Sequence, residues 1–197
     1  EMVGKKYGSK PCDTYANYRD LCARDDIDVV IVATPDHWHA VQALEALRNG
    51  KDIYCEKPVT HFFAEGQALY REVAKRKAIF QTGSQQRSAT VFRNAVELVR
   101  NGLIGKVKEV QVGLPKGPDK IKGDPTEEDR SGREDYQLWT GPAPMLPYVH
   151  ARHHQMWRVH LAYGGGQLMD WIGHHNDIAH WGLGEDRGGP IRVEARN

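Results

Sequence analysis

A lysine directly followed by a proline ends a short apolar segment of this sequence, in the run YCEKPVTH at residues 54–61. The preceding residues 52–55 are predicted to form a buried strand, which would deliver the amine of Lys57 to the strand's end. An amine fixed in a cleft can give or take a proton during a reaction. A lone Lys-Pro pair more often lies in a surface loop, so a catalytic lysine is predicted here only if other reactive groups converge on it.

A second set of polar side chains lies in GGGQLMDWIGHHNDIAHWGLG, at residues 164–184. A helix predicted over about 167–181 would place four residues, spaced four, three and four apart, on one face: Asp170, His174, Asp177 and Trp181. An aspartate and a histidine at i and i+4 can hydrogen-bond, which would orient the imidazole and support its protonated form. The alternative is a local surface pair that stabilises the helix by roughly 0.2–0.5 kcal/mol.

The ten histidines cluster at residues 37–39, 150–160 and 174–180, which raises the question of a metal site. Zinc needs three or four convergent ligands, and neither HxH in a strand-to-helix turn nor HH in a helix is an established zinc spacing. We therefore expect no metal. The sequence also lacks GxSxG, the motif of a serine nucleophile, GxxxxGK[ST], the phosphate loop, and GxGxxG, the dinucleotide turn.

The elements that would position these groups alternate between strand and helix. DVVIVAT, at residues 28–34, is a continuous β-branched run of the kind that is buried on both faces of a parallel sheet. Further strands are predicted over 52–55, 79–83 and 107–113, and helices over about 17–24, 37–49, 62–77 (with Thr60 as N-cap) and 89–101. This alternation predicts a Rossmann-like, doubly wound α/β fold with a parallel sheet. The segments ATPDHWH, CEKP and TGSQQR would lie at its carboxyl edge, where ligands bind in such sheets.

Residues 114–150 are rich in prolines and charges and show no clear period. A stretch of this length is either a disordered linker or an ordered functional excursion. The aromatic residues Tyr136, Trp139 and Tyr148 favour the ordered alternative. After the helix predicted over about 167–181, IRVEA at 191–195 predicts the start of one more strand.

The bulk composition excludes several classes of protein. Lys and Arg number 27 against 26 Asp and Glu, so the formal net charge of +1 gives no bulk electrostatic attraction to nucleic acid or to an anionic membrane. No apolar run approaches the roughly 20 residues that span a bilayer. Three cysteines without a CxxC pair argue against a disulfide framework, and reduced thiols are expected.

Taken together, three segments resemble the Gfo/Idh/MocA oxidoreductase family: DVVIVATPDHWHAVQALEALRNGKDIYCEKPVTH, TGSQQRS and the triple-glycine segment at 164–184. ATPxxxH combined with EKP at this spacing is specific to that family. The variant WxGPAPxxPY at 139–148 is similar to a bacterial branch with its own type of C-terminal domain. The resemblance covers essentially the whole chain.

The resemblance implies two domains. Residues 1–105 would be part of a Rossmann domain that binds NAD or NADP, and residues 106–197 would begin a C-terminal α/β domain with an open antiparallel sheet. In family members the second domain covers the nicotinamide and often forms the oligomer interface, so a homo-oligomer is expected. Compared with the family, the sequence lacks the glycine turn, the residue that selects NAD or NADP, and most of the second domain. We therefore expect a fragment, with the missing turn upstream of Glu1.

Carried onto this sequence, the resemblance assigns the acid/base role beside the nicotinamide to Lys57, and the DxxxH pair that holds the substrate oxygen to Asp170 and His174. It further implies a set of cofactor contacts and three substrate contacts: Thr34, Pro35, His37, Glu56, Lys57, Pro58 and Gln85 for the cofactor, and Arg87, Trp157 and His175 for the substrate. The Lys57–Pro58 bond is an expected cis peptide, as often in the family; the cis form costs only about 0.5–1 kcal/mol before proline.

The function implied is NAD(P)-dependent hydride transfer to or from a hydroxyl or carbonyl carbon of a sugar, polyol or sugar derivative. Two alternatives stay open: a redox-assisted glycosidase, lyase or epimerase that keeps its NAD tightly bound, and a non-catalytic nucleotide-binding protein. The expected partner is a small sugar-like molecule, with neither nucleic acid nor membrane. The expected location is cytoplasmic or periplasmic, since any targeting segment would lie upstream of this sequence.

Overall fold

The computed structural model describes residues 6, 8, 12–118 and 123–195. A short helix α2 (Tyr18–Cys22) precedes three parallel strands in the order β1 (Val29–Val32), β2 (Asp52–Glu56) and β3 (Phe80–Gly83). Val32 pairs with Cys55 and Cys55 pairs with Thr82, so the three strands end at nearly the same level. The predicted parallel sheet is confirmed, with strand ends that differ from the prediction by one or two residues.

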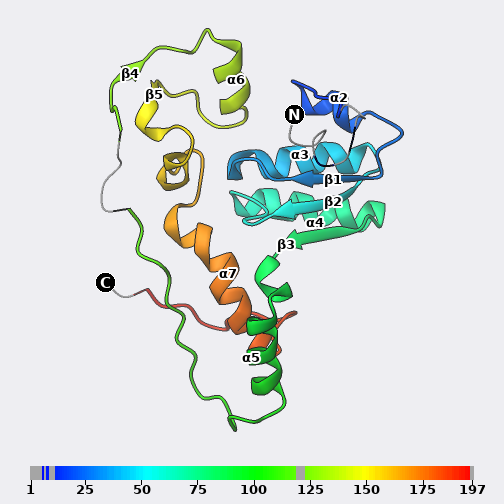
Figure 1. The fold of residues 1–197 in the computed structure, drawn as a ribbon, viewed down its shortest axis with the longest axis vertical. Helices are drawn as coiled ribbons and strands as arrows, with labels where there is room; N and C mark the ends of the chain where they lie inside the picture. Colours follow the sequence, from blue (N-terminus) through cyan, green and yellow to red (C-terminus); the bar gives the residue numbers. More distant parts are fainter. Residues whose placement is uncertain (1–5, 7, 9–11, 119–122, 196–197) are drawn as a thin grey trace.

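Helices α3 (Asp36–Arg48) and α4 (Phe63–Arg76) connect the strands and lie along the sheet (Figure 1). Ala43, Ala46 and Leu47 of α3 are fully buried in one core with Ile53 and Cys55 of β2. Small alanine side chains let the helix approach the sheet closely, and burial of each large aliphatic side chain contributes about 1.5–3 kcal/mol. This core holds the strand ends in place.

The start of α4 differs from the prediction. The N-cap is Phe62, so the prediction of Thr60 is wrong. Glu65 Oε2 accepts hydrogen bonds from the backbone N–H groups of His61 at 2.9 Å and Phe62 at 3.0 Å. The Glu65 carboxylate thereby satisfies the backbone donors at the start of the helix. This is the role that the prediction gave to the side chain of Thr60.

After β3, a 3-10 turn η1 (Gln85–Ser88) leads into α5 (Thr90–Arg100), which packs against the long helix α7 (Gly166–Leu183) (Figure 1). The helices predicted at 89–101 and 167–181 are confirmed. None of the helices in the described part of the chain is both long enough and apolar enough to cross a membrane.

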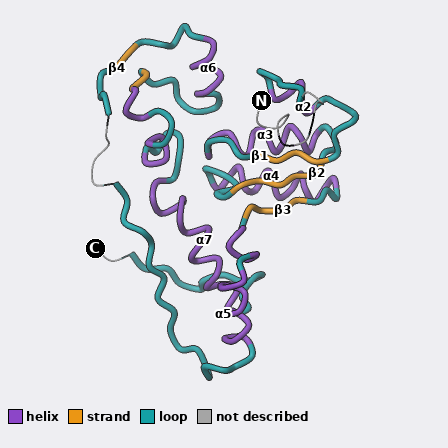
Figure 2. The backbone as a smooth tube through the Cα atoms, in the orientation of Figure 1, coloured by secondary structure: helices purple, strands orange, loops and turns teal. Residues whose placement is uncertain are grey.

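Two predicted strands do not form among the described residues. Residues 107–113 and 191–195 run as loop (Figure 2). An extended segment becomes a strand only when a neighbour exchanges backbone hydrogen bonds with it, and neither segment has such a neighbour in the described ranges. Apolar side chains of both segments are accordingly exposed: Val110, Val112, Ile191 and Val193.

The proline-rich region is ordered where the structure describes it, as predicted. β4 (Glu127–Glu128) pairs antiparallel with β5 (Tyr148–Val149), and α6 (Glu134–Thr140) lies between them in the chain. Tyr136 stacks on Trp139 with ring centroids 6.1 Å apart and meets Tyr148 edge-on at 5.5 Å. These rings give the region a small core of its own. The 3-10 turns η2 (His150–Arg152) and η3 (Met156–Val159) then lead to α7.

Helix α3 meets this second region through the Trp38 side chain. Its Nε1 donates to the main-chain carbonyl of Trp139 at 2.9 Å. Gly141, the C-cap of α6, lies against the indole ring: an added Cβ would sit 2.1 Å from Trp38 Cζ2. The close approach of backbone to ring therefore requires a residue without a side chain.

Replacing Gly141 with alanine is expected to destabilise the protein. Gly141 has φ 51°, a left-handed conformation that disfavours a side chain, and the new methyl would overlap the Trp38 ring. We expect the free energy of unfolding to fall by about 2–4 kcal/mol, measured by urea denaturation, because backbone strain and overpacking each contribute about 1–3 kcal/mol. The matched control is Gly132→Ala, since Gly132 has no atom within 4 Å of the added methyl. Equal losses in the two variants would contradict this packing.

Candidate active site

The residues that follow the three strands lie at one edge of the sheet, as predicted. Thr34 follows β1, Glu56 ends β2 and leads to Lys57, and Gly83 ends β3. The parallel strands end level with one another, so their carboxyl ends open onto a common space. Gly83 pairs with Glu56 and leaves it room, because a Cβ at Gly83 would lie 2.8 Å from Glu56 Oε2.

The side chain of Lys57 reaches from this edge to helix α7. Its Nζ donates to the main-chain carbonyl of Asp170 at 2.5 Å and to Asp170 Oδ1 at 3.1 Å. The Lys57 side chain is 14% exposed, so the ion pair lies largely out of solvent. Gly173 of α7 packs beside the lysine stem, since a Cβ there would be 3.4 Å from Lys57 Cβ. The fold thus joins two residues that the sequence places 113 positions apart.

His39 holds the turn that presents the lysine, and the prediction does not include it. Its Nδ1 lies 2.6 Å from the carbonyl oxygen of Pro58 and its Nε2 lies 2.6 Å from that of Thr34. The ring is 2% exposed and bridges the ends of β1 and β2. The Lys57–Pro58 bond is cis, as expected. The motif ATPxxxH ends at His39, so the motif itself is the sequence signal for this residue, whereas the expected cofactor contact is His37.

His37, predicted to contact the cofactor, lies instead where the two halves of the chain meet. Its ring nitrogens are 3.0 Å from the carbonyl of Trp139 and 3.2 Å from that of Tyr163. Burial lowers the pKa of His37, although hydrogen bonds to the two carbonyls oppose this shift. A neutral imidazole carries one N–H and donates to one carbonyl at a time. Both ring nitrogens lie against these main-chain carbonyls, which gives the ring a structural position between the two halves of the chain.

His174 lies beside Lys57 but is not hydrogen-bonded to Asp170, so this part of the prediction is wrong. Asp170 Oδ1 is occupied by Lys57, and His174 Nδ1 is buried without a hydrogen-bond partner in the described part of the chain. Burial lowers the pKa of His174, and the Lys57 ammonium lowers it further, against the raising effect of Asp170. The ring is therefore neutral at about pH 7, the reverse of the protonated form that the helical spacing suggested.

Asp36, at the first position of α3, ties the sheet edge to the triple-glycine segment. Its Oδ2 accepts a hydrogen bond from Gly165 N at 3.4 Å. Burial raises the pKa of Asp36, while the hydrogen bond from Gly165 lowers it. The prediction does not single out this carboxylate, because nothing in its sequence context indicated a partner in the distant glycine run.

Arg87, predicted to bind substrate, is occupied by helix α7. It donates to Asp177 at 2.7 and 2.8 Å and to Asp186 at 2.9 Å. These carboxylates raise the pKa of Arg87, although burial opposes them. The side chain therefore docks η1 onto α7, and its forked donors are already in use.

The other predicted residues lie in different surroundings. Trp157 is 6% exposed and packs beneath the Arg158 guanidinium, which lies 4.5 Å from the ring centroid. His175 Nδ1 lies 2.7 Å from the carbonyl of Gly113, so this ring is engaged with the loop at 107–113. Thr34 and Gln85 lie at the strand ends, and Thr34 Oγ1 donates to Gln42 at 3.0 Å.

A cavity of about 330 Å³ opens beside Asp170. It is lined by residues of the second half of the chain: Pro118, Gln155, Met156, Arg158, Val159, Gly166, Gln167 and Asp170. Its size suits a small ligand of one sugar ring or somewhat larger. The prediction does not include Arg158, because an isolated arginine in a stretch without periodicity gives no sign of where it points.

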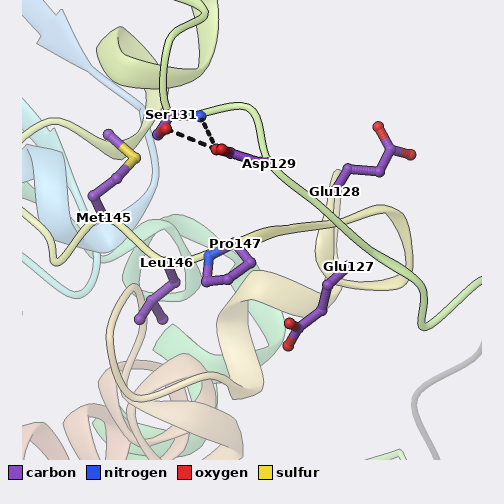
Figure 3. Close-up of a pocket in the computed structure, with 7 residues that line it drawn as sticks. All are labelled: Glu127, Glu128, Asp129, Ser131, Met145, Leu146 and Pro147. Atoms are coloured by element: carbon purple, nitrogen blue, oxygen red, sulfur yellow. Dashed lines mark hydrogen bonds between the residues drawn. The ribbon is translucent and has the colours of Figure 1, made fainter.

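A second cavity, of about 400 Å³, lies between β4 and the loop before β5 and shares no lining residue with the first (Figure 3). Asp129 Oδ1 accepts from Ser131 N at 3.0 Å and from Ser131 Oγ at 2.7 Å, and Glu128 pairs with Arg130 at 2.7 Å. We assign no chemistry to these satisfied surface contacts. Within the described ranges, no group of three or more His, Cys, Asp or Glu could hold a metal.

A nicotinamide could be held where the strand ends meet Lys57. The side chains at this edge that could contact it are those of Thr34, Pro35, Glu56, Pro58 and Gln85. The unpartnered Nδ1 of His174 is a buried polar atom beside Lys57, of the kind that a bound hydroxyl or amide would satisfy. These residues fit the reactive end of a dinucleotide; the sequence has no GxGxxG turn for the pyrophosphate.

Comparison with known proteins divides the chain into two matched parts. The family profile GFO_IDH_MocA, described as "Oxidoreductase family, NAD-binding Rossmann fold", matches residues 2–84. The profile GFO_IDH_MocA_C2, described as "Oxidoreductase family, C-terminal alpha/beta domain", matches residues 89–197. The second match alone covers more than half of the chain.

Two curated relatives and one solved structure illustrate the similarity. The chain is 31% identical over 96 residues to 2,7-anhydro-N-acetylneuraminate hydratase of Mediterraneibacter gnavus, covering 49% of this chain and 26% of that protein. It is 32% identical over 92 residues to levoglucosan dehydrogenase of Pseudarthrobacter phenanthrenivorans, covering 47% and 24%. An oxidoreductase domain protein from Kribbella flavida has a similar structure, with TM-score 0.65 and 27% identity over 92% of this chain and 41% of that chain. The matched part thus spans about a quarter of these curated relatives.

The stability of the protein is expected to depend on pH through His37. Because the folded state holds the pKa of His37 below its ordinary value, the unfolded chain binds the proton more readily. This contribution is fully present above the unfolded pKa of about 6.5 and is lost as the pH falls below it. We expect the urea concentration at the midpoint of unfolding to decrease when the pH is lowered from about 7 to about 5.5. His37→Gln is expected to weaken this pH dependence.

The comparison between variants isolates His37 from other titrating groups. The pKa of His174 is also lowered and acts in the same sense, whereas burial raises the pKa of Asp36, which acts in the opposite sense. The matched control is His180→Gln, at the last turn of α7. An identical pH dependence in the wild type and in His37→Gln would contradict the assignment.

Proposed function

Since the chain belongs to the Gfo/Idh/MocA oxidoreductase family, whose Rossmann fold binds NAD, we propose that it takes part in NAD(P)-dependent hydride transfer at a hydroxyl- or carbonyl-bearing carbon of a sugar, polyol or sugar derivative. The observation that carries this proposal is the contact between Lys57 and Asp170 at the carboxyl edge of the sheet. A lysine amine at that edge supports the proposal, because ligands of a Rossmann sheet bind there.

The cofactor would lie along the strand ends, in contact with Thr34, Pro35, Glu56, Pro58 and Gln85. When bound, NAD or NADP supplies a carbon that accepts or releases a hydride. The buried surroundings of Lys57 support this placement, because a site that excludes water strengthens the electrostatic contacts made to the reacting oxygen.

The chain's own residues would manage the proton and the charge. For oxidation of an alcohol, the neutral ring of His174 takes the hydroxyl proton as the hydride leaves the carbinol carbon and the C=O bond forms. The ammonium of Lys57 donates a hydrogen bond to the substrate oxygen and stabilises the negative charge that develops on it. Asp170 holds the ammonium through its main-chain carbonyl and its Oδ1. In the reverse direction the same proton returns to the oxygen.

The substrate class is supported by the relatives rather than by the residues. One similar protein is named levoglucosan dehydrogenase, which acts on a sugar derivative, and the cavity beside Asp170 has a volume suited to a molecule of that size. We also propose a homo-oligomeric assembly, which light scattering of the purified protein tests.

A second candidate is a redox-assisted lyase or glycosidase that keeps its cofactor bound. It is favoured by one observation, the similarity to a protein named as a hydratase, since adding or removing water involves no net oxidation. Net accumulation of NADH from added NAD⁺ with polyols or levoglucosan supports the dehydrogenase. Product formed without any net change in the cofactor supports the second candidate. The complete set of Lys57, Asp170 and His174 argues against a purely nucleotide-binding protein.

Replacing Lys57 with alanine is expected to abolish turnover and to leave most of the cofactor affinity. The amine acts on the substrate oxygen, whereas several strand-end residues contact the cofactor. Turnover is followed as NADH absorbance and cofactor binding as quenching of protein fluorescence. Lys75→Ala, at an exposed position of α4, is the matched control. Full activity in Lys57→Ala would remove the lysine from the mechanism.

Replacing His174 with alanine is expected to lower kcat by about 10²–10⁴, the usual contribution of a positioned acid or base. For alcohol oxidation, the loss is expected to be larger at low pH than at high pH. Little hydroxide is then present in solution to replace the missing base. Steady-state kinetics of both directions measure it. His180→Ala, on another face of α7, is the control. A change of less than about threefold would assign His174 to structure alone.

A further inference from the structure

The cavity beside Asp170 contains an arginine whose hydrogen-bonding capacity is largely unused. Arg158 lines this cavity, and its side chain is 43% exposed. Its one charged contact among the described residues is Asp170 Oδ1, 3.8 Å from its Nε, and its guanidinium makes no hydrogen bond in that part of the chain. A guanidinium has five N–H donors. Arg87, by contrast, donates three hydrogen bonds to Asp177 and Asp186.

The surroundings of Arg158 hold its position. The guanidinium lies over the buried ring of Trp157, 4.5 Å from the centroid, in a cation–π contact. The main chain of Arg158 packs against Gly164, where an added Cβ would lie 2.9 Å from the Arg158 carbonyl oxygen. A guanidinium held in this way loses little freedom when it binds a planar anion in a bidentate manner.

Two cations share one carboxylate at the edge of the cavity. Lys57 and Arg158 both contact Asp170 Oδ1, so one carboxylate faces two cations. Asp170 is the single acidic residue among those that line the cavity. One carboxylate is thus shared between two cations, and the unused donors of Arg158 can attract an anion into the cavity.

The position of the cavity indicates that this anion belongs to the substrate and not to the cofactor. Its lining residues lie between 118 and 170 and include none of the strand-end residues at 34–35, 56–58 and 85. Lys57 and Arg158 contact the same oxygen, so their separation cannot exceed the two contact distances combined. One sugar ring covers that span. A sugar whose reacting oxygen lies at Lys57 would thus place a ring substituent at Arg158.

We propose that Arg158 binds a carboxylate of the substrate and selects acidic sugars, such as uronates, over neutral ones. This assignment deepens the proposed function and rests on it for the identity of the bound molecule as substrate. The guanidinium pairs with both carboxylate oxygens, and the side chains of Gln155 and Gln167 supply amide groups for the sugar hydroxyls. Arg158 is then a specificity-determining residue, whereas Lys57 and His174 act on the reacting oxygen.

The test compares acids with amides of the same shape. D-glucuronate and D-galacturonate are titrated calorimetrically against the protein, in parallel with D-glucuronamide and D-galacturonamide, which lack the negative charge. We expect at least one acid to bind about tenfold or more tightly than its amide. Arg158→Gln is expected to weaken the affinity for that acid by about 10- to 100-fold, the range for a charge-assisted hydrogen-bonded pair. The affinity for the amide is expected to change by less than about threefold.

Two further variants control for charge and folding. Arg158→Lys keeps the positive charge without the planar fork, so it is expected to retain part of the preference for the acid. Arg93→Gln removes an arginine of α5 that is 66% exposed, and it is expected to leave both affinities unchanged. Thermal unfolding of each variant confirms that it folds.

The outcomes separate this proposal from the proposed function. Equal affinity for acid and amide, equal weakening of both by Arg158→Gln, or no binding of any acid would each overturn the role of Arg158. If neutral polyols reduce NAD⁺ while no acid binds more tightly than its amide, the oxidoreductase function stands and the proposed acid selectivity is wrong. If acids bind in an Arg158-dependent manner but never reduce NAD⁺, the binding site stands and the oxidoreductase function falls.

Discussion

The ion pair between Lys57 and Asp170 is the interaction on which the rest of the site depends. The ammonium is largely shielded from water, and it reaches both the side chain and the main chain of Asp170. Removing either partner of such a pair would leave a poorly solvated charge behind, which is strongly unfavourable. Since Lys57 follows β2 and Asp170 belongs to α7, one contact sets both the position of the amine and the position of the helix against the sheet. The candidate active site is therefore also part of the joint between the two halves of the chain.

The first turn of α3 supplies the other half of this joint. Successive side chains of a helix point about 100° apart, so neighbouring residues can serve different surfaces. His37 and Trp38 face the carbonyl of Trp139, Asp36 faces Gly165, and His39 turns back to the strand ends. Each of these four polar side chains finds a main-chain partner in this way, as most buried polar side chains do in stable folds. The run ATPDHWH is consequently a structural connector as well as an edge of the ligand site.

The sequence was sufficient for those features that depend on local pattern. The β-branched run at 28–34 and the helical spacing at 167–181 predicted their elements to within a few residues, and parallel topology then brought the strand ends together. Features that depend on a distant partner were not predictable in this way. Asp170 was expected to bond His174 by its i, i+4 spacing, but the ammonium of Lys57 occupies that oxygen. The segments at 107–113 and 191–195 have strand-like sequences, yet a strand also needs a neighbour, and none lies beside them in the described ranges.

The contact between Gly173 and the stem of Lys57 has an evolutionary consequence. An added methyl at position 173 would touch the first carbon of the lysine side chain, so a larger residue there would displace the amine from the carboxylate. The two positions are therefore constrained jointly, although 57 and 173 lie in different halves of the chain. Relatives that keep the amine are expected to keep a small residue opposite it, and lineages that have lost the amine are free to enlarge position 173. Such correlated substitution would record the selection pressure on the lysine.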